Sequence, residues 1–179
     1  MTSPSFNAPY TSARQWNAGG FLDTPVSEYI HFTGHAGYTV YSPEASIAAI
    51  ATDDFTGVYA QIEVRHRVNQ YVDYSLSGGR SLSLAYWGQT IDRYFARWSA
   101  NWRIVEKVAL DTSFSFEHGT ELYGYSETYN QCGPGISVRR IITEKLSGSL
   151  GYQVYWRDSD RPGRDYTVNI VSLDFNYTF

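Results

Sequence analysis

The last residues of the chain, Val171-Ser-Leu-Asp-Phe-Asn-Tyr-Thr-Phe179, alternate between apolar and polar side chains. Every odd position carries Val, Leu, Phe or Tyr, and every even position carries Ser, Asp, Asn or Thr. A period of two places successive side chains on opposite faces of a β-strand. This stretch therefore predicts a strand that separates an apolar environment from a polar one.

The same alternation recurs through the rest of the chain. In the segment from Lys145 to Arg157 the even positions are mainly Leu, Tyr, Val and Trp, whereas Lys, Ser, Gln and Arg occupy the odd ones. Further strands are expected at Gln15–Leu22 (the weakest), Ile30–Val40, Val58–Arg67, Val72–Ser77, Arg93–Arg103, Lys107–Glu117 and Ile136–Arg139. Most of these segments have about ten residues, the length that a tilted strand needs to cross a bilayer, whereas strands of soluble proteins average about five or six.

The composition favours an all-β protein and excludes several other classes. Aromatic residues make up 17% of the 179 residues, and such residues suit a pleated surface. The net charge of −4 includes no basic block of the kind that nucleic-acid binding needs. The one cysteine, Cys132, excludes an internal disulfide framework, and no apolar stretch is long enough for a transmembrane helix.

The beginning of the chain does not resemble a secretory leader. The segment Met1-Thr-Ser-Pro-Ser-Phe-Asn-Ala-Pro9 lacks both a charged and an apolar region. We expect residues 1–14 to be a loop or a disordered start and residues 15–179 to form one region of strands. Because an exported protein requires a leader, either a leader has been removed or Met1 is not the natural start, and we expect this chain to be the C-terminal part of a larger barrel.

The expected links between strands alternate in length. Short links are predicted at Val68–Gln70, Ile104–Glu106, Thr143–Glu144 and, with Pro25, Asp23–Glu28. Long polar links are predicted at Ser42–Thr56, Gly79–Thr90, Gly119–Asn130 and Asp158–Asp165. Short periplasmic turns and long outer loops are typical of outer-membrane barrels, so the pattern predicts an antiparallel up-and-down transmembrane β-barrel.

Aromatic side chains on the apolar face provide a second indication of a membrane. Trp156, Tyr177, Trp102 and Tyr94 lie near expected strand ends, where an interfacial girdle would place them. A soluble barrel that binds a lipid or a pigment is the alternative, with its apolar face turned inward. Strand length and loop asymmetry favour lipid on the apolar face.

Two features resemble known outer-membrane proteins. The pattern Leu173-x-Phe175-x-Tyr177-x-Phe179 resembles the C-terminal signal that the barrel-assembly machinery recognises. The segments from Leu146 to Thr167 and from His66 to Leu76 resemble the β-barrel porin type 2 family, and the likeness runs from about Gly20 to the end. The resemblance implies a location in the outer membrane, a barrel about twice this length, and, for some relatives, a link to exopolysaccharide export.

No catalytic motif is evident, and the chain is expected not to be an enzyme and to hold no cofactor. His31 and His35 lie on one face of a strand, but about 13 Å apart at roughly 3.3 Å per residue, which is too far to share a metal ion. Asp158-Ser-Asp160 lacks the spacing and final Glu of a calcium loop and is interpreted as part of a charged outer turn.

The charged strand face is the best candidate for function. If the alternation is right, it lines the barrel, and its charges set solute selectivity or pair with one another. The predicted lining residues are Arg65, Arg93, Arg97, Arg103, Arg139, Glu63, Asp111 and Glu117, with Arg67 and Asp174 beside them.

Two functions follow from this arrangement. The first is passive, porin-like passage of small solutes or saccharides across the outer membrane. The alternative is a non-conducting barrel that acts as a surface adhesin or an assembly scaffold through its outer loops, and the aromatic segment from Glu121 to Tyr129 motivates this alternative.

Overall fold

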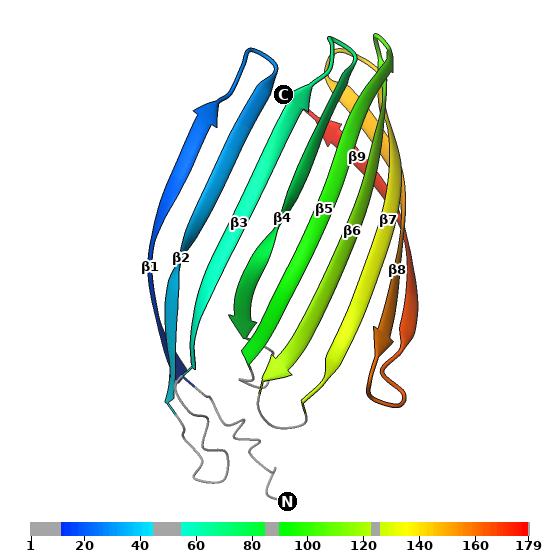
Figure 1. Ribbon diagram of the computed structural model, residues 1–179. Coiled ribbons are helices and arrows are strands. Elements are labelled where there is room, and N and C mark those ends of the chain that lie inside the picture. Colours follow the sequence, from blue (N-terminus) through cyan, green and yellow to red (C-terminus); the bar gives the residue numbers. More distant parts are fainter. Residues whose placement is uncertain (1–11, 45–54, 85–89, 123–125, 179) are drawn as a thin grey trace, which may run out of the picture.

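A single antiparallel sheet contains all the strands that the structure describes. The structure is a computed structural model that describes residues 12–44, 55–84, 90–122 and 126–178. In this nine-stranded sheet each strand pairs with the next one along the chain (Figure 1). The strands are β1 (Ser12–Pro25), β2 (Ile30–Glu44), β3 (Phe55–Arg67), β4 (Val72–Leu84), β5 (Thr90–Val105), β6 (Val108–Leu122), β7 (Thr128–Ile141), β8 (Leu146–Ser159) and β9 (Tyr166–Tyr177).

No helix in the described part of the chain has the length and apolar character needed to span a membrane.

The strands predicted from alternation are confirmed, including the weakest one, which is part of β1. The predicted strand ends are less accurate. Pro25 was expected in a link but lies at the end of β1, and the short strand predicted at Ile136–Arg139 is the centre of the much longer β7. The segment Gly133-Pro134-Gly135 lies inside β7, where the pairing with β8 is interrupted between Cys132 and Gly135. This interruption is what proline requires, because its nitrogen cannot donate to a ladder.

Tight turns join the strands at one end of the sheet. They comprise residues 26–29, 68–71, 106–107 and 142–145. Side chains close three of them: the Asn69 amide oxygen accepts hydrogen bonds from the nitrogens of Tyr71 (2.7 Å) and Val72 (2.9 Å), and the Ser27 and Thr143 hydroxyls accept similar bonds. Asn, Ser and Thr favour turns for this reason.

The other end of the sheet carries the longer connections. They are residues 45–54, 85–89, 123–127 and 160–165, and the first three include residues outside the described part of the chain. The predicted sorting of short and long links to opposite ends is therefore confirmed. The long links at Gly79–Thr90 and Gly119–Asn130 are shorter than predicted, because β4 continues to Leu84 and β6 to Leu122.

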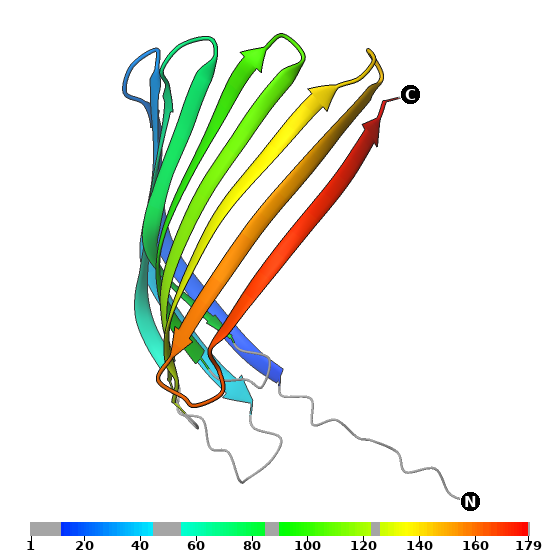
Figure 2. The same ribbon diagram turned by 90° about the vertical axis from the view of Figure 1, so that its right-hand side faces the viewer.

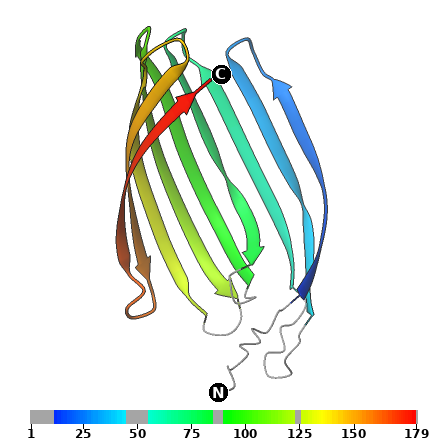
Figure 3. The ribbon, with the colours of Figure 1, turned by 180° about the vertical axis from the view of Figure 1, so that it is seen from behind.

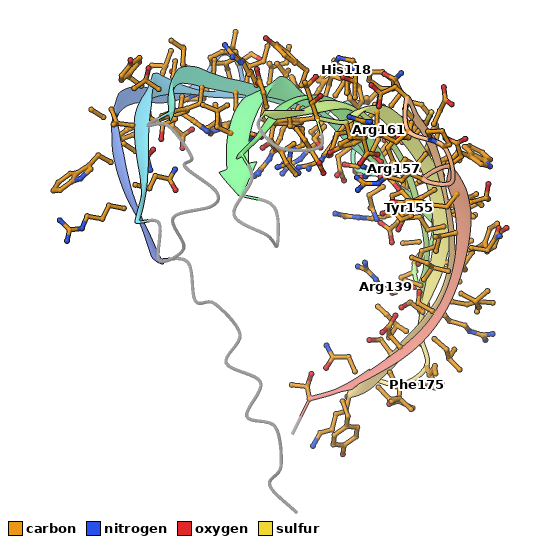
Figure 4. All side chains as sticks on the ribbon, turned by 90° about the horizontal axis from the view of Figure 1, so that it is seen from below. His118, Arg139, Tyr155, Arg157, Arg161 and Phe175 are labelled. Atoms are coloured by element: carbon orange, nitrogen blue, oxygen red, sulfur yellow. The ribbon has the colours of Figure 1, made fainter. Side chains whose placement is uncertain are left out.

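The sheet is strongly curved and therefore has a concave and a convex face (Figures 2 and 4). Arg139, Tyr155 and Arg157 project from the concave side, whereas Phe175 and His118 project from the convex side (Figure 4). Because side chains alternate along each strand and neighbouring strands pair in a defined register, these positions assign the remaining residues to a face.

The convex face has the surface expected of a lipid contact. Leu150, Val171, Leu173 and Phe175 are 57–71% exposed there, far more than a soluble protein would leave open in one patch. The four aromatic residues predicted to form a girdle, Tyr94, Trp102, Trp156 and Tyr177, all lie on this face and are 42–53% exposed. Apolar exposure of this extent on the outside of a curved sheet fits a hydrocarbon environment.

A polar row crosses the convex face near the long connections and marks the limit of the apolar band at that end. Its members are neighbours in register across five strands: Arg80, Tyr94, His118, Asn130 and Asp158. Arg80 forms a bidentate ion pair with Asp92 (2.8 and 2.7 Å), and the His118 ring bonds the Asn130 side chain (2.8 Å). These pairings satisfy polar groups at the edge of the band.

The two edges of the sheet, β1 and β9, run in the same direction, because both end at the side of the tight turns (Figure 3). No pairing between them is found among the described residues. Two strands that run in parallel cannot continue an antiparallel ladder. An antiparallel barrel that contains this sheet therefore needs an odd number of additional strands, which gives the even total of single-chain bacterial barrels.

Candidate functional site: the concave face

All the predicted lining residues lie on the concave face. They come from β3 (Glu63, Arg65), β5 (Arg93, Arg97, Arg103), β6 (Asp111, Glu117) and β7 (Arg139), and Arg67 and Asp174 share the face. Their role in selectivity stays a prediction. Phe175 and Tyr177 of the predicted assembly signal lie on the convex face near the end of β9, and Phe179 is outside the described residues.

Ion pairs hold some of these charges and leave others without a carboxylate. Arg65 lies 2.5 Å from Glu63, Arg139 lies 3.2 Å from Asp111, and Arg93 lies 3.4 Å from Glu117. Arg97 and Arg103 have no ion pair with any residue that the structure describes. Mutual pairing, one of the two alternatives for the charged face, thus accounts for part of its charges, and the selectivity role of the others stays a prediction.

A connected polar network occupies the concave face at the end of the long connections. The Tyr129 hydroxyl donates a hydrogen bond to Glu117 (2.7 Å), which is also the partner of Arg93. The Arg157 guanidinium lies over the Tyr129 ring, 3.6 Å from its centroid, and donates to Glu127 (2.8 Å). The network links β5, β6, β7 and β8 to the residues just before β7.

Glu127 is the most buried charged group of the structure, with 1% of its surface exposed. Its carboxylate accepts hydrogen bonds from Arg157 (2.8 Å), from Ser159 (2.7 Å) and from Arg164. Burial alone would raise the pKa of Glu127, but these hydrogen bonds together lower it to about 2. The carboxylate is therefore ionised at any physiological pH.

A second contact joins the same two connections. Arg161 donates through two nitrogens to the Ser126 carbonyl, at 2.9 and 2.7 Å. Asp160 was predicted to be part of a charged outer turn, and it lies with Arg161 and Arg164 in the β8–β9 connection. Their partners show that this turn is tied to the connection between β6 and β7, which fixes part of the rim.

Inward tyrosines lie flat along the wall. The ring of Tyr129 covers Gly119 on β6, and the ring of Tyr155 covers Gly133 on β7, so closely that a Cβ at either glycine would overlap the ring. Tyr59 covers Gly37 on β2 in the same way. The glycines thus give the large aromatic side chains room against the sheet, and the space in front of the concave face stays free.

Toward the tight turns the concave face lines a cavity of about 990 Å³. Small and polar side chains from several strands form much of its wall, including Ser75, Ser99, Asn101, Ser137 and Gln153. Ser75 and Ser99 are hydrogen-bonded to each other (2.8 Å), and Asn101 donates to Asp111 (2.7 Å). Ile30, Ile170 and a few other apolar side chains share the wall, but its hydroxyl, amide and charged groups suit water and hydrophilic solutes.

The two histidines of β2 have separate partners. His31 bonds the carboxylate of Asp23, and the His35 ring lies 6.1 Å from the Tyr59 ring. Within residues 12–44, 55–84, 90–122 and 126–178, no group of three or more His, Cys, Asp or Glu is arranged to hold a metal ion.

Alternation did not identify the network around Glu127. It correctly assigned Arg157 to the polar face, but Glu127 precedes β7 in a predicted loop, and its partners lie more than 25 residues away along the chain. A sequence period shows which residues share a face but does not show which of them pair. The one available signal was the cluster of Arg161 and Arg164 opposite the acidic residues Glu121 and Glu127.

Comparisons with known proteins support the fold. No known family profile and no curated protein match the chain. A loop-deletion mutant of OmpT, an outer membrane protein of Vibrio cholerae, matches 91% of this chain with a TM-score of 0.62 and 11% sequence identity. The match covers 53% of the OmpT mutant, so the protein described here spans about half the length of that chain. LpxR from Salmonella typhimurium matches with a TM-score of 0.36 and 10% identity, over 88% of this chain and 76% of that one.

The fold is that of an outer-membrane β-barrel, which confirms the predicted architecture and location. One prediction is wrong as it was made: the chain was expected not to be an enzyme. The match to the OmpT mutant, at 11% identity, shows the fold alone. A barrel of this kind therefore gives no ground for excluding catalysis, and fold alone does not decide between classes of activity.

Proposed function

We propose that the concave face is part of the wall of a water-filled passage through which small polar solutes or saccharides cross the outer membrane. The observation that carries this proposal is the contrast between the two faces. The convex face is apolar over a broad band, whereas the concave face carries charged, hydroxyl and amide groups along the whole length of the strands. Polar interiors are typical of barrels that conduct.

The space in front of the wall supports the same proposal. Tyr59, Tyr129 and Tyr155 lie against glycines and do not project across the concave side. Serines and Gln153 line the cavity near the tight turns. A barrel filled by its own side chains would instead place large residues across its interior, as small closed barrels do.

Three narrower expectations accompany the proposal. Membership of the β-barrel porin type 2 family stays a prediction from the resemblance. So does recognition by the barrel-assembly machinery through Phe175, Tyr177 and Phe179. Passage of a saccharide in particular is suggested by the resemblance alone.

Electrical recordings from planar bilayers test the proposal. The protein is extracted from outer membranes in its native assembly and added to one side of the bilayer. We expect discrete, ohmic conductance steps in 1 M KCl. Absence of steps, together with unchanged uptake of saccharides by cells that lack the protein, would contradict the proposal and favour the adhesin or scaffold alternative.

A further inference from the structure

The arginines of the concave face fall into two groups. The first group is held by carboxylates at 2.5 to 3.4 Å and consists of Arg65, Arg93, Arg139 and Arg157. The second group, Arg67, Arg97 and Arg103, has no carboxylate within ion-pair distance in the part of the chain that the structure describes. Arg67 and Arg103 lie beside the turn at residues 68–71 and line a common hollow there together with Asp73. Arg97 lies in the middle of β5.

The surroundings of Arg97 leave its charge uncompensated. Its direct neighbours in register are Ser77 on β4 and Ser115 on β6. The nearest acidic positions are already in use: Glu63, one strand beyond Ser77, pairs with Arg65, and Glu117 accepts from Arg93 and Tyr129. An arginine that faces an aqueous passage needs no carboxylate partner from the protein, so its charge is available to solutes.

The position of the guanidinium suits a ligand. Arg97 lies over the Phe95 ring, 4.7 Å from its centroid, and Phe95 itself is 7% exposed. The Phe95 ring packs against one face of the guanidinium. The flanking serines have short side chains, which leave space beside the guanidinium for a ligand. A guanidinium held in this way can donate two parallel hydrogen bonds to a carboxylate or phosphate group.

We propose that Arg97 is the centre of an anion-binding subsite in the passage, and that the solutes taken preferentially carry a carboxylate or phosphate group. Ser77 and Ser115 are the flanking hydroxyls, and Arg67 and Arg103 lie nearer the tight-turn end, where Asp73 shares their hollow. The inference rests on the proposed passage and adds its solute class. It names the oxyanion, which can belong to an acidic saccharide or to a free phosphate.

The test measures block of the chloride current by sodium phosphate, at constant ionic strength, in planar bilayers that contain the natively assembled protein. Sodium glucuronate and glucose are tested in parallel as a carboxylate sugar and its neutral counterpart. We expect phosphate and glucuronate to reduce the current at millimolar concentration and glucose to have no effect. Substitution Arg97→Gln should raise the half-blocking phosphate concentration about tenfold, the loss expected for a charge-assisted hydrogen bond.

Arg65→Gln is the matched comparison, because it removes the same charge from the same face but from an ion pair. It should shift the half-blocking phosphate concentration less than about threefold. Arg97→Lys, which keeps the charge but not the planar fork, should give an intermediate value. If the channel conducts but Arg97→Gln and Arg65→Gln change phosphate block equally, or if glucose blocks as well as glucuronate does, the subsite is overturned and the passage stands. If the parent protein does not conduct, the passage itself fails.

Discussion

Replacing Leu76 by arginine tests which face of the sheet contacts lipid. Leu76 lies on the convex face of β4, between Val64 and Trp98 in register, and is 53% exposed. Arg80 of the polar row is four residues farther along the strand. At about 3.3 Å per residue this separation is roughly 13 Å, or about 10 Å in depth for a strand tilted by about 40°.

The apolar band of such barrels is about 25 Å tall, so Leu76 lies close to its middle. An arginine at the midplane costs about 2–4 kcal/mol of folding free energy. The adjacent Ser77 has the same depth but lies on the concave face, between Glu63 and Arg97. There the attraction of one neighbour and the repulsion of the other offset each other, so Ser77→Arg should cost less than about 1 kcal/mol.

The assay is urea-dependent folding of both variants into liposomes, with the parent protein measured under the same conditions. The difference in unfolding free energy between Leu76→Arg and Ser77→Arg should be at least about 1 kcal/mol, in favour of Ser77→Arg. Equal costs, or a larger cost for Ser77→Arg, would show that the two faces have been assigned wrongly.

Two further predictions concern the concave face. Glu127→Gln should lower the free energy of unfolding at pH 7 by about 3 kcal/mol, because the pKa of Glu127 is about 2 in the folded state and about 4.5 in the unfolded state. This stabilisation is complete above pH 4.5 and is lost as the pH falls toward 2, so the difference from the parent protein should shrink to about half or less at pH 3. A difference that stays constant in denaturant titrations at the two pH values would refute the ionic role. Gly119→Ala should push the Tyr129 ring off the wall and break its bond to Glu117, which should cost about 1–3 kcal/mol and reduce single-channel conductance. Adding Tyr129→Ala should restore the conductance, and failure to do so would mean that the ring is not the obstacle.

The faces of the sheet could be predicted from the sequence because strand periodicity is simple. The even positions of β8 from Leu146 to Trp156 were expected on the apolar side, and they lie on the convex face. One irregularity in register, between Arg103 and Val105, lies at the very end of β5 and therefore does not exchange the faces along the strand. Two environments on opposite sides of a strand leave a clear record in the residue pattern.

The outer strand ends were missed for a physical reason. Residues Ser81–Leu84 of β4 and Gly119–Leu122 of β6 were expected in loops, yet they continue the strands beyond the polar row. The segment Ser81-Leu82-Ser83-Leu84 still alternates, but the glycine pair Gly78-Gly79 before it is typical of a turn and has no side chain that marks a face. The backbone ladder continues through this pair, so the strand is longer than the pattern indicates.

Which arginines pair with a carboxylate could also not be predicted from the sequence. Arg65 and Arg97 belong to the same face by their spacing, but one has a carboxylate at 2.5 Å and the other has serines on both sides. This difference depends on the register of three strands, which a single-strand pattern does not contain. The buried Glu127 depends on contacts between two connections, and connections carry no period at all.

A scan of spin labels along β8 tests the central claim most directly. Single cysteines are placed at each position from 147 to 157 in a Cys132→Ser background, labelled with a nitroxide, and measured in lipid for collision with oxygen and with a water-soluble nickel complex. If the concave face is aqueous, the nickel complex should reach odd positions such as Ser149 and Gln153. Oxygen should reach even positions such as Leu150 and Tyr152, so that the two profiles are out of phase. In-phase profiles, or nickel accessibility at the even positions, would contradict an aqueous concave face.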